Sequence, residues 1–90
     1  MGIETILFKS EEKKKRSDIA DVLRTLADKV DHGRLTLQQD QTKTLVEFPD
    51  QMVLELKVEE EQGRRKLKKS LEIELEWTVG ESGSSDTQIL

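Results

Sequence analysis

The chain has 90 residues and a formal charge of −4, from 15 basic and 19 acidic side chains. This length predicts one small domain with a modest core, and the mild acidity disfavours a general nucleic-acid binder, which usually has a strongly basic domain. Because the chain contains no cysteine, disulfides and thiolate metal sites are excluded.

Neither a targeting segment nor a membrane segment is expected. The apolar runs fall far short of the about 18 residues that cross a bilayer. The short run Ile6–Phe8 also follows acidic Glu4, unlike a secretory signal peptide. Although 38% of the residues are charged, the apolar ones fall into periodic stretches, which argues for a folded chain. We therefore expect a small soluble protein of the cytoplasm.

The first segment, Ile3 to Phe8, is rich in β-forming side chains and predicts a short strand. A charged segment follows and ends in four consecutive basic residues, Lys13, Lys14, Lys15 and Arg16. Such runs are usually solvated connections or helix starts. The alternative interpretation is a phosphate-binding patch, so these four residues are candidate polyanion contacts.

A helix is expected next, because the apolar residues recur with a period of 3.6. They are Ile19, Val22, Leu23, Leu26, Ala27 and Val30. Ser17 is a candidate N-cap, and Gly33 suits the left-handed conformation that ends many helices. His32 precedes this glycine, where its ring can contact the last carbonyl groups. We predict a structural role for this histidine rather than a catalytic one.

From Arg34 onward, apolar and polar residues alternate, which predicts strands with one buried face. The clearest strand is Leu71–Trp77, in which three glutamates alternate with four apolar residues, including the only tryptophan. Short turns keep every apolar set on one face of an antiparallel meander. The turns are expected at Asp40-Gln41, Pro49–Gln51 and Gln62-Gly63.

These turns predict a specific register. Leu35 faces Val46, Val46 faces Leu54, and Leu54 faces Leu71. In the last hairpin, Glu59, Glu60 and Glu61 face Lys66, Arg65 and Arg64. Such facing opposite charges contribute about 0.2–1 kcal/mol each. Two mismatches remain, because Lys57 faces Lys68 and Lys69 faces Leu56. We interpret the basic run Arg64–Lys69 mainly as the pairing partner of these glutamates. The alternative is that Arg64, Arg65 and Lys68 contact a polyanion.

The predicted fold is α+β and two-layered, with one amphipathic helix packed on one face of a twisted, mainly antiparallel sheet of four to five strands. One domain spans residues 1–79, as a strand, a helix and a four-strand meander, and a flexible tail spans residues 80–90. The strand near the N-terminus is placed beside the last one. The expected core comprises Leu23, Leu26, Val46, Phe48, Leu54, Ile73, Leu75 and Trp77.

Three segments together are similar to one known family. Phe8–Lys13, Ile19–Val30 and Leu71–Trp77 resemble the amphi-Trp domain family of small prokaryotic proteins, over roughly residues 3–79. The amphipathic strand ending in tryptophan is the most specific of the three. The resemblance implies a serine-like N-cap where this chain has Lys15, so the helix start is expected anywhere from residue 15 to 18. The family has no assigned activity, so the resemblance implies no functional residue.

An enzyme is disfavoured, because the chain has one histidine, no cysteine and no glycine-rich phosphate loop. We identify no catalytic, cofactor-binding or metal-ligating residue and expect no cofactor. The glutamate row Glu72, Glu74 and Glu76 is best explained as a solvated sheet face; weak binding of divalent cations is the alternative.

Three functions therefore remain as hypotheses. The first is a non-catalytic interaction or assembly module that uses a sheet edge or the charged sheet face, as a homodimer or with a protein partner. The second is weak nucleic-acid or polyanion binding through Lys13–Arg16 and Arg64–Lys69. The third is an uncharacterised enzyme or divalent-cation binder that uses the glutamate row.

Overall fold

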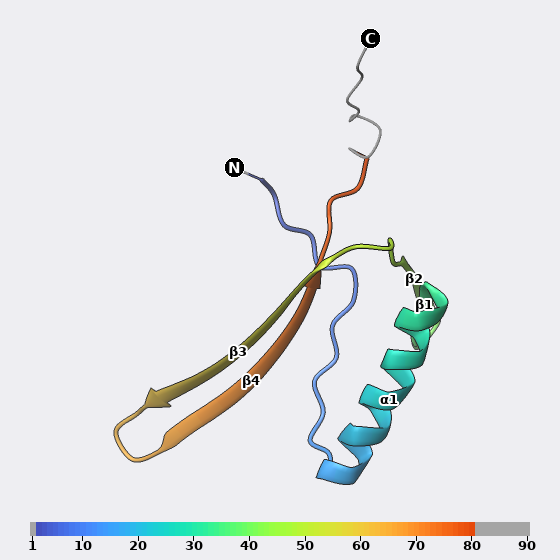
Figure 1. The fold of residues 1–90 in the computed structure, drawn as a ribbon. Helices are drawn as coiled ribbons and strands as arrows, with labels where there is room; N and C mark the ends of the chain where they lie inside the picture. The colour runs from blue at the N-terminus through green and yellow to red at the C-terminus, as the bar shows by residue number, and fades with distance from the viewer. Residues whose placement is uncertain (1, 81–90) are drawn as a thin grey trace. The chain divides into compact units, whose positions relative to one another are not determined.

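A computed structural model describes residues 2–80 of the chain. The elements are α1 (Arg16–His32), β1 (Arg34–Gln39), β2 (Thr42–Glu47), β3 (Val53–Gln62) and β4 (Leu67–Glu76). They form two compact units, one ending at Phe48 and the other beginning at Pro49, and each is described by itself (Figure 1). The predicted α+β class with antiparallel strands is confirmed. The predicted tail, apart from Gly80, lies outside the described residues.

Helix α1 begins at Arg16, within the expected range of residues 15 to 18, but Ser17 is not its N-cap. Lys15 is the N-cap residue in an extended conformation, and its side chain makes no capping hydrogen bond. Its carbonyl accepts the N–H of Ile19 at 3.0 Å, which closes the first turn. The predicted N-cap Ser17 already lies inside α1, so that prediction is wrong.

The end of α1 follows the sequence prediction. Gly33 adopts a left-handed conformation with φ of 93°, and its N–H donates to the carbonyls of Lys29 at 2.9 Å and Val30 at 3.1 Å. The His32 ring nitrogen Nδ1 lies 2.7 Å from the carbonyl oxygen of Asp28. The predicted contact of His32 with the last helical carbonyls is therefore confirmed.

The first unit joins this helix to an antiparallel hairpin. Strands β1 and β2 pair with Leu35 opposite Val46 and Leu37 opposite Thr44, the predicted register. The turn residue Asp40 has a positive φ of 56°, which aspartate tolerates better than most residues. The helix contacts β1, so α1 packs against this hairpin through one of its strands.

The strands do not form one meander. Among residues 2–80 there are two two-stranded sheets, β1–β2 and β3–β4. The expected pairing of Val46 with Leu54 is absent, because the segment between Phe48 and Met52 is irregular. Pro49 lies in this segment and has no N–H to donate to a strand ladder. The predicted four-strand meander is thus corrected to two hairpins.

The predicted strand near the N-terminus is also wrong. Residues Ile3 to Phe8 contain no strand, and Ile3 is 94% exposed. The Thr44 hydroxyl donates a hydrogen bond to the carbonyl of Leu7 in this segment at 3.5 Å. Strand propensity depends on a neighbouring strand that supplies hydrogen bonds and packing, and no strand pairs with this segment in residues 2–80.

The expected core is not buried, since no hydrophobic residue of the described part of the chain is fully enclosed. A helix on two strands, and a hairpin of two strands, each leave apolar surface in water. Of the eight expected core residues, those half-buried are Leu26, Val46, Phe48, Leu75 and Trp77, and those exposed are Leu23, Leu54 and Ile73.

Candidate interaction surface

Strands β3 and β4 form a long antiparallel hairpin (Figure 1). The hairpin has two chemically distinct faces, and its register determines which residues share each face. Val58 lies opposite Leu71, Leu56 opposite Ile73, and Leu54 opposite Leu75. Directly opposite residues share a face of an antiparallel sheet, so these three pairs form one surface. We call these six residues the apolar face.

This register corrects the prediction for the last hairpin. Leu54 lies opposite Leu75 rather than Leu71, a shift of four residues that keeps the predicted face of every side chain. A longer loop accommodates the shift: residues 63–66 connect the strands, and the Gly63 N–H donates to the Lys66 carbonyl at 2.8 Å.

The shift also rearranges the charges. The pairs are now Glu59 with Ser70, Glu60 with Lys69, and Glu61 with Lys68. Both mismatches of the predicted register disappear. Lys69 Nζ lies 3.3 Å from Glu60 Oε2, and Lys57 Nζ lies 3.6 Å from Glu72 Oε1.

The apolar face is largely exposed to water. Val58 is 73% exposed, Leu71 66% and Leu56 63%, and only Leu75 is half-buried. An isolated two-stranded hairpin is at best marginally stable in water, and extra strands or a helix are needed to cover its apolar side. The face is therefore a surface that gains stability from being covered.

The opposite face of the hairpin is charged and not evenly balanced. Lys57 lies 3.6 Å from both Glu59 and Glu72, and the charge of Glu59, followed by that of Glu72, raises the pKa of the Lys57 ammonium. Glu74 lies opposite Glu55. The hydrogen bond with Glu55, and then the charges of Glu55 and Glu76, raise the pKa of the Glu74 carboxyl. This end of the face therefore has excess negative charge.

The basic residues proposed as polyanion contacts fall into one group in each unit. Arg64 and Arg65 lie in the loop between β3 and β4, and Lys68 lies in β4 opposite Glu61. The predicted glutamate partners of the two arginines pair elsewhere, and within residues 2–80 neither arginine forms an ion pair. The hairpin loop therefore presents two arginines to solvent.

The other group surrounds the start of α1. Lys13 precedes the helix, Lys15 is its N-cap, and Arg16 is its first residue. Lys14 Nζ lies 3.2 Å from Glu12 Oε1. A basic group at a helix N-terminus adds to the positive end of the helix dipole, so this group slightly destabilises α1.

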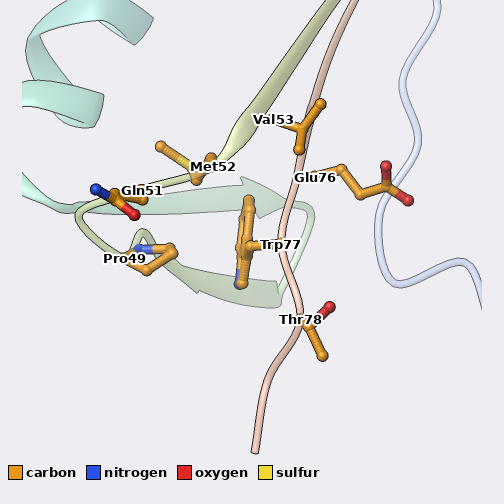
Figure 2. A pocket seen from close by; sticks show the side chains of 7 residues that line it. All are labelled: Pro49, Gln51, Met52, Val53, Glu76, Trp77 and Thr78. Carbon is orange, nitrogen blue, oxygen red and sulfur yellow. The ribbon is translucent and has the colours of Figure 1, made fainter. Parts of the chain in front are cut away.

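A hollow of about 610 Å³ lies at the end of β4, within the second unit. Figure 2 shows the indole of Trp77 directed toward the loop that carries Pro49 and Gln51. The lining residues are Pro49, Gln51, Met52, Val53, Glu76, Trp77 and Thr78. Glu76 is the only ionisable side chain among them, so the hollow offers no pair of groups for acid–base or nucleophilic catalysis.

Two further findings concern metals and membranes. In the part of the chain that the structure describes, no group of three or more histidine, aspartate or glutamate side chains is arranged to hold a metal ion. Within residues 2–80 the structure has one helix, α1, and it is too short and too polar to cross a bilayer.

The geometry defines a small α+β chain whose main accessible feature is an amphipathic hairpin preceding a tryptophan. The chain belongs to the Amphi-Trp domain family, whose model matches residues 1–90. Neither the search of curated proteins nor that of solved structures found a match. The predicted family is therefore confirmed over the whole chain.

The sequence predicted the strands of this hairpin, but it did not predict that their apolar face is exposed. Leu54, Ile73 and Leu75 were expected in a core, yet the structure leaves their face accessible. The sequence signal for this exposure was present: the charged residues Glu60 and Lys69 share that face, which is unusual for a strand that is buried along its whole length.

Proposed function

We propose that the protein is a small non-catalytic interaction module that binds through the β3–β4 hairpin. The observation that carries this proposal is an apolar face of six side chains on one strand pair, five of them exposed and Leu75 half-buried. Contiguous exposed apolar surface on a small protein commonly marks a protein–protein contact. Open strand edges on the same hairpin add main-chain hydrogen-bonding groups, the basis of binding by strand addition.

Co-purification from native cells tests the proposal with two matched variants. Leu56→Ser alters the apolar face, and Val53→Ser alters the opposite face of the same hairpin; both residues are 63% exposed. The wild-type protein and Val53→Ser should retain the same set of proteins, and Leu56→Ser should lose it, with unchanged far-UV circular dichroism. Retention of the same set by Leu56→Ser, or of nothing by the wild type, would contradict the proposal.

A second candidate function is polyanion binding through the hairpin loop. Its support is the absence of ion pairs at Arg64 and Arg65 within residues 2–80. Binding to duplex or single-stranded nucleic acid should weaken steeply with salt and should be lost in Arg64→Ala/Arg65→Ala. Arg24→Ala is the control, because Arg24 pairs with Asp21 at 2.8 Å on α1. No retention at low salt would exclude this function.

We also propose a cytoplasmic location in a prokaryotic cell, on the composition and the family resemblance. Fractionation of native cells with detection of the protein would test the location; recovery outside the cytoplasmic fraction would contradict it.

A further inference from the structure

The β3–β4 hairpin has two outer strand edges, one on β3 and one on β4. In residues 2–80, β4 has one strand neighbour, β3, and β3 has no other neighbour than β4. Each strand therefore has one edge whose N–H and C=O groups point away from the hairpin, and such an edge is a template for another strand. The two edges differ in charge, and the charge indicates which of them accepts a second copy of the chain.

Antiparallel pairing of a strand with its own copy brings one half of the strand opposite the other half. Strand β4 has a basic half, with Lys68 and Lys69, and an acidic half, with three glutamates. Self-pairing therefore matches opposite charges. Strand β3 has four glutamates and one lysine, so self-pairing of β3 places glutamates near one another. Of the two edges of this hairpin, only that of β4 is self-complementary in charge.

We propose that two copies of the chain pair antiparallel along β4, with Leu71 of each copy opposite the other at the two-fold axis. This inference rests on the proposed function and names its partner. The pairing gives one four-stranded sheet in the order β3–β4–β4–β3. Three or more strands with an apolar face can be stable in water, whereas a two-stranded hairpin alone is at best marginally stable.

The register follows from the side chains. With Leu71 at the axis, Lys68 lies opposite Glu74 of the second copy, and Leu67 lies opposite Leu75. Lys69 then faces Ile73 at the margin of the apolar face, where its ammonium already lies 3.3 Å from Glu60 of its own chain.

Other registers of the β4–β4 pair bring less compatible side chains opposite each other than the register with Leu71 at the axis. A shift of one residue puts the apolar side chains of one copy on the charged face of the other. An axis at Glu72 sets two glutamates opposite each other, and an axis at Ser70 sets Leu71 opposite Lys69.

The crowding of carboxylates at Glu74 supports the same pairing. Glu74 lies opposite Glu55 in its own hairpin, and hydrogen bonding with Glu55 and the charges of Glu55 and Glu76 raise its pKa. Within residues 2–80 no lysine or arginine forms an ion pair with Glu74. Lys68 of the second copy supplies the missing positive charge.

Disulfide formation tests the axis directly, since the natural chain has no cysteine. Directly opposite residues of an antiparallel pair have Cα atoms about 4.5–5.5 Å apart, within disulfide range. Leu71→Cys should therefore form a covalent dimer under mild oxidation. Val58→Cys is the control: Val58 is comparably exposed but is separated from its copy by three strand spacings, about 14 Å.

Charge exchange tests the register. Glu74→Lys places opposite charges on the Glu55–Glu74 pair of each hairpin, so it does not weaken the hairpin, but it sets the new lysine opposite Lys68 of the second copy. The dimer dissociation constant should rise roughly tenfold or more, and the added change Lys68→Glu should restore it. Glu59→Lys makes the same charge change on β3, opposite Ser70. It removes the 3.6 Å ion pair of Glu59 with Lys57, but it lies away from the β4 edge and should leave the dimer intact.

The outcomes separate this inference from the proposed function. A wild-type chain that sediments at its monomer mass of 10.4 kDa at all concentrations overturns the β4 dimer, as does cross-linking of Val58→Cys without Leu71→Cys. The proposed function then still stands if native partners are retained through Leu56. Cross-linking of Leu71→Cys alone, with the loss in Glu74→Lys restored by Lys68→Glu, supports the dimer.

Discussion

At the scale of single residues, Lys15 shows the clearest conflict between local sequence and local structure. It occupies the N-cap of α1 in an extended conformation but makes no side-chain capping bond. Serine at an N-cap accepts a hydrogen bond from an otherwise unpaired helical N–H, and a lysine cannot do so. Its charge also opposes the positive end of the helix dipole.

Replacing this lysine should therefore stabilise the protein. We expect Lys15→Ser to raise the free energy of unfolding by about 1 kcal/mol, measured by urea denaturation with far-UV circular dichroism. Lys13→Ser removes the same charge outside the helix and should change the stability much less. Equal effects of the two variants would show that charge, not capping, is responsible.

Glu74 gives a pH dependence whose sign can be stated. Its pKa is raised in the folded chain, first by hydrogen bonding with Glu55 and then by the neighbouring carboxylates. The folded chain therefore binds this proton more readily than the unfolded chain. Its stability falls as pH rises from the ordinary glutamate pKa through the raised pKa of Glu74.

The variant Glu74→Gln should lose this fall in stability over that pH window, in urea melts at concentrations low enough to keep the chain monomeric. Glu55→Gln removes the first cause of the shift and should reduce the fall as well. The same pH dependence in the wild type and in Glu74→Gln would contradict the assignment.

At the scale of elements, the helix and the faces of all four strands followed from the sequence, because each depends on local periodicity. The register of β3 and β4 did not. A shift of four residues leaves every side chain on its predicted face, so alternation alone cannot detect it. The information lay in the charges: only the observed register gives both Lys57 and Lys69 an acidic partner.

A double-mutant cycle distinguishes the two registers. In the observed register, Glu60 and Lys69 lie opposite each other with a 3.3 Å ion pair, and their coupling energy should be about 0.2–1 kcal/mol. In the predicted register, Glu60 faces Arg65 instead. The Glu60–Arg65 cycle should therefore give a coupling energy near zero. A coupling between Glu60 and Arg65, with none between Glu60 and Lys69, would instead support the predicted register with its two-residue turn.

Pairings between distant segments were the least predictable. The expected strand at Ile3–Phe8 and the expected β2–β3 pairing both depended on a partner edge rather than on the segment's own residues. Neither is formed. The expected core failed for the same reason, since burial requires a second layer over each apolar face. The candidate surface consists of the apolar residues for which a second layer was assumed.

For the molecule as a whole, the proposed dimer requires that the outer edge of β4 bind the same strand of a second copy. Amide hydrogen exchange measured by NMR tests it residue by residue, because an amide that donates to a strand partner exchanges slowly. In an isolated hairpin, the amides of each strand are protected only where they point toward the other strand. In the proposed dimer, β4 gains a second partner and β3 does not.

We therefore predict slow exchange for consecutive amides along Leu67–Glu76 and alternating protection along Val53–Gln62. The extra protection of β4 should decrease on dilution and be absent in Glu74→Lys. Alternating protection in both strands at high protein concentration would contradict the β4 dimer.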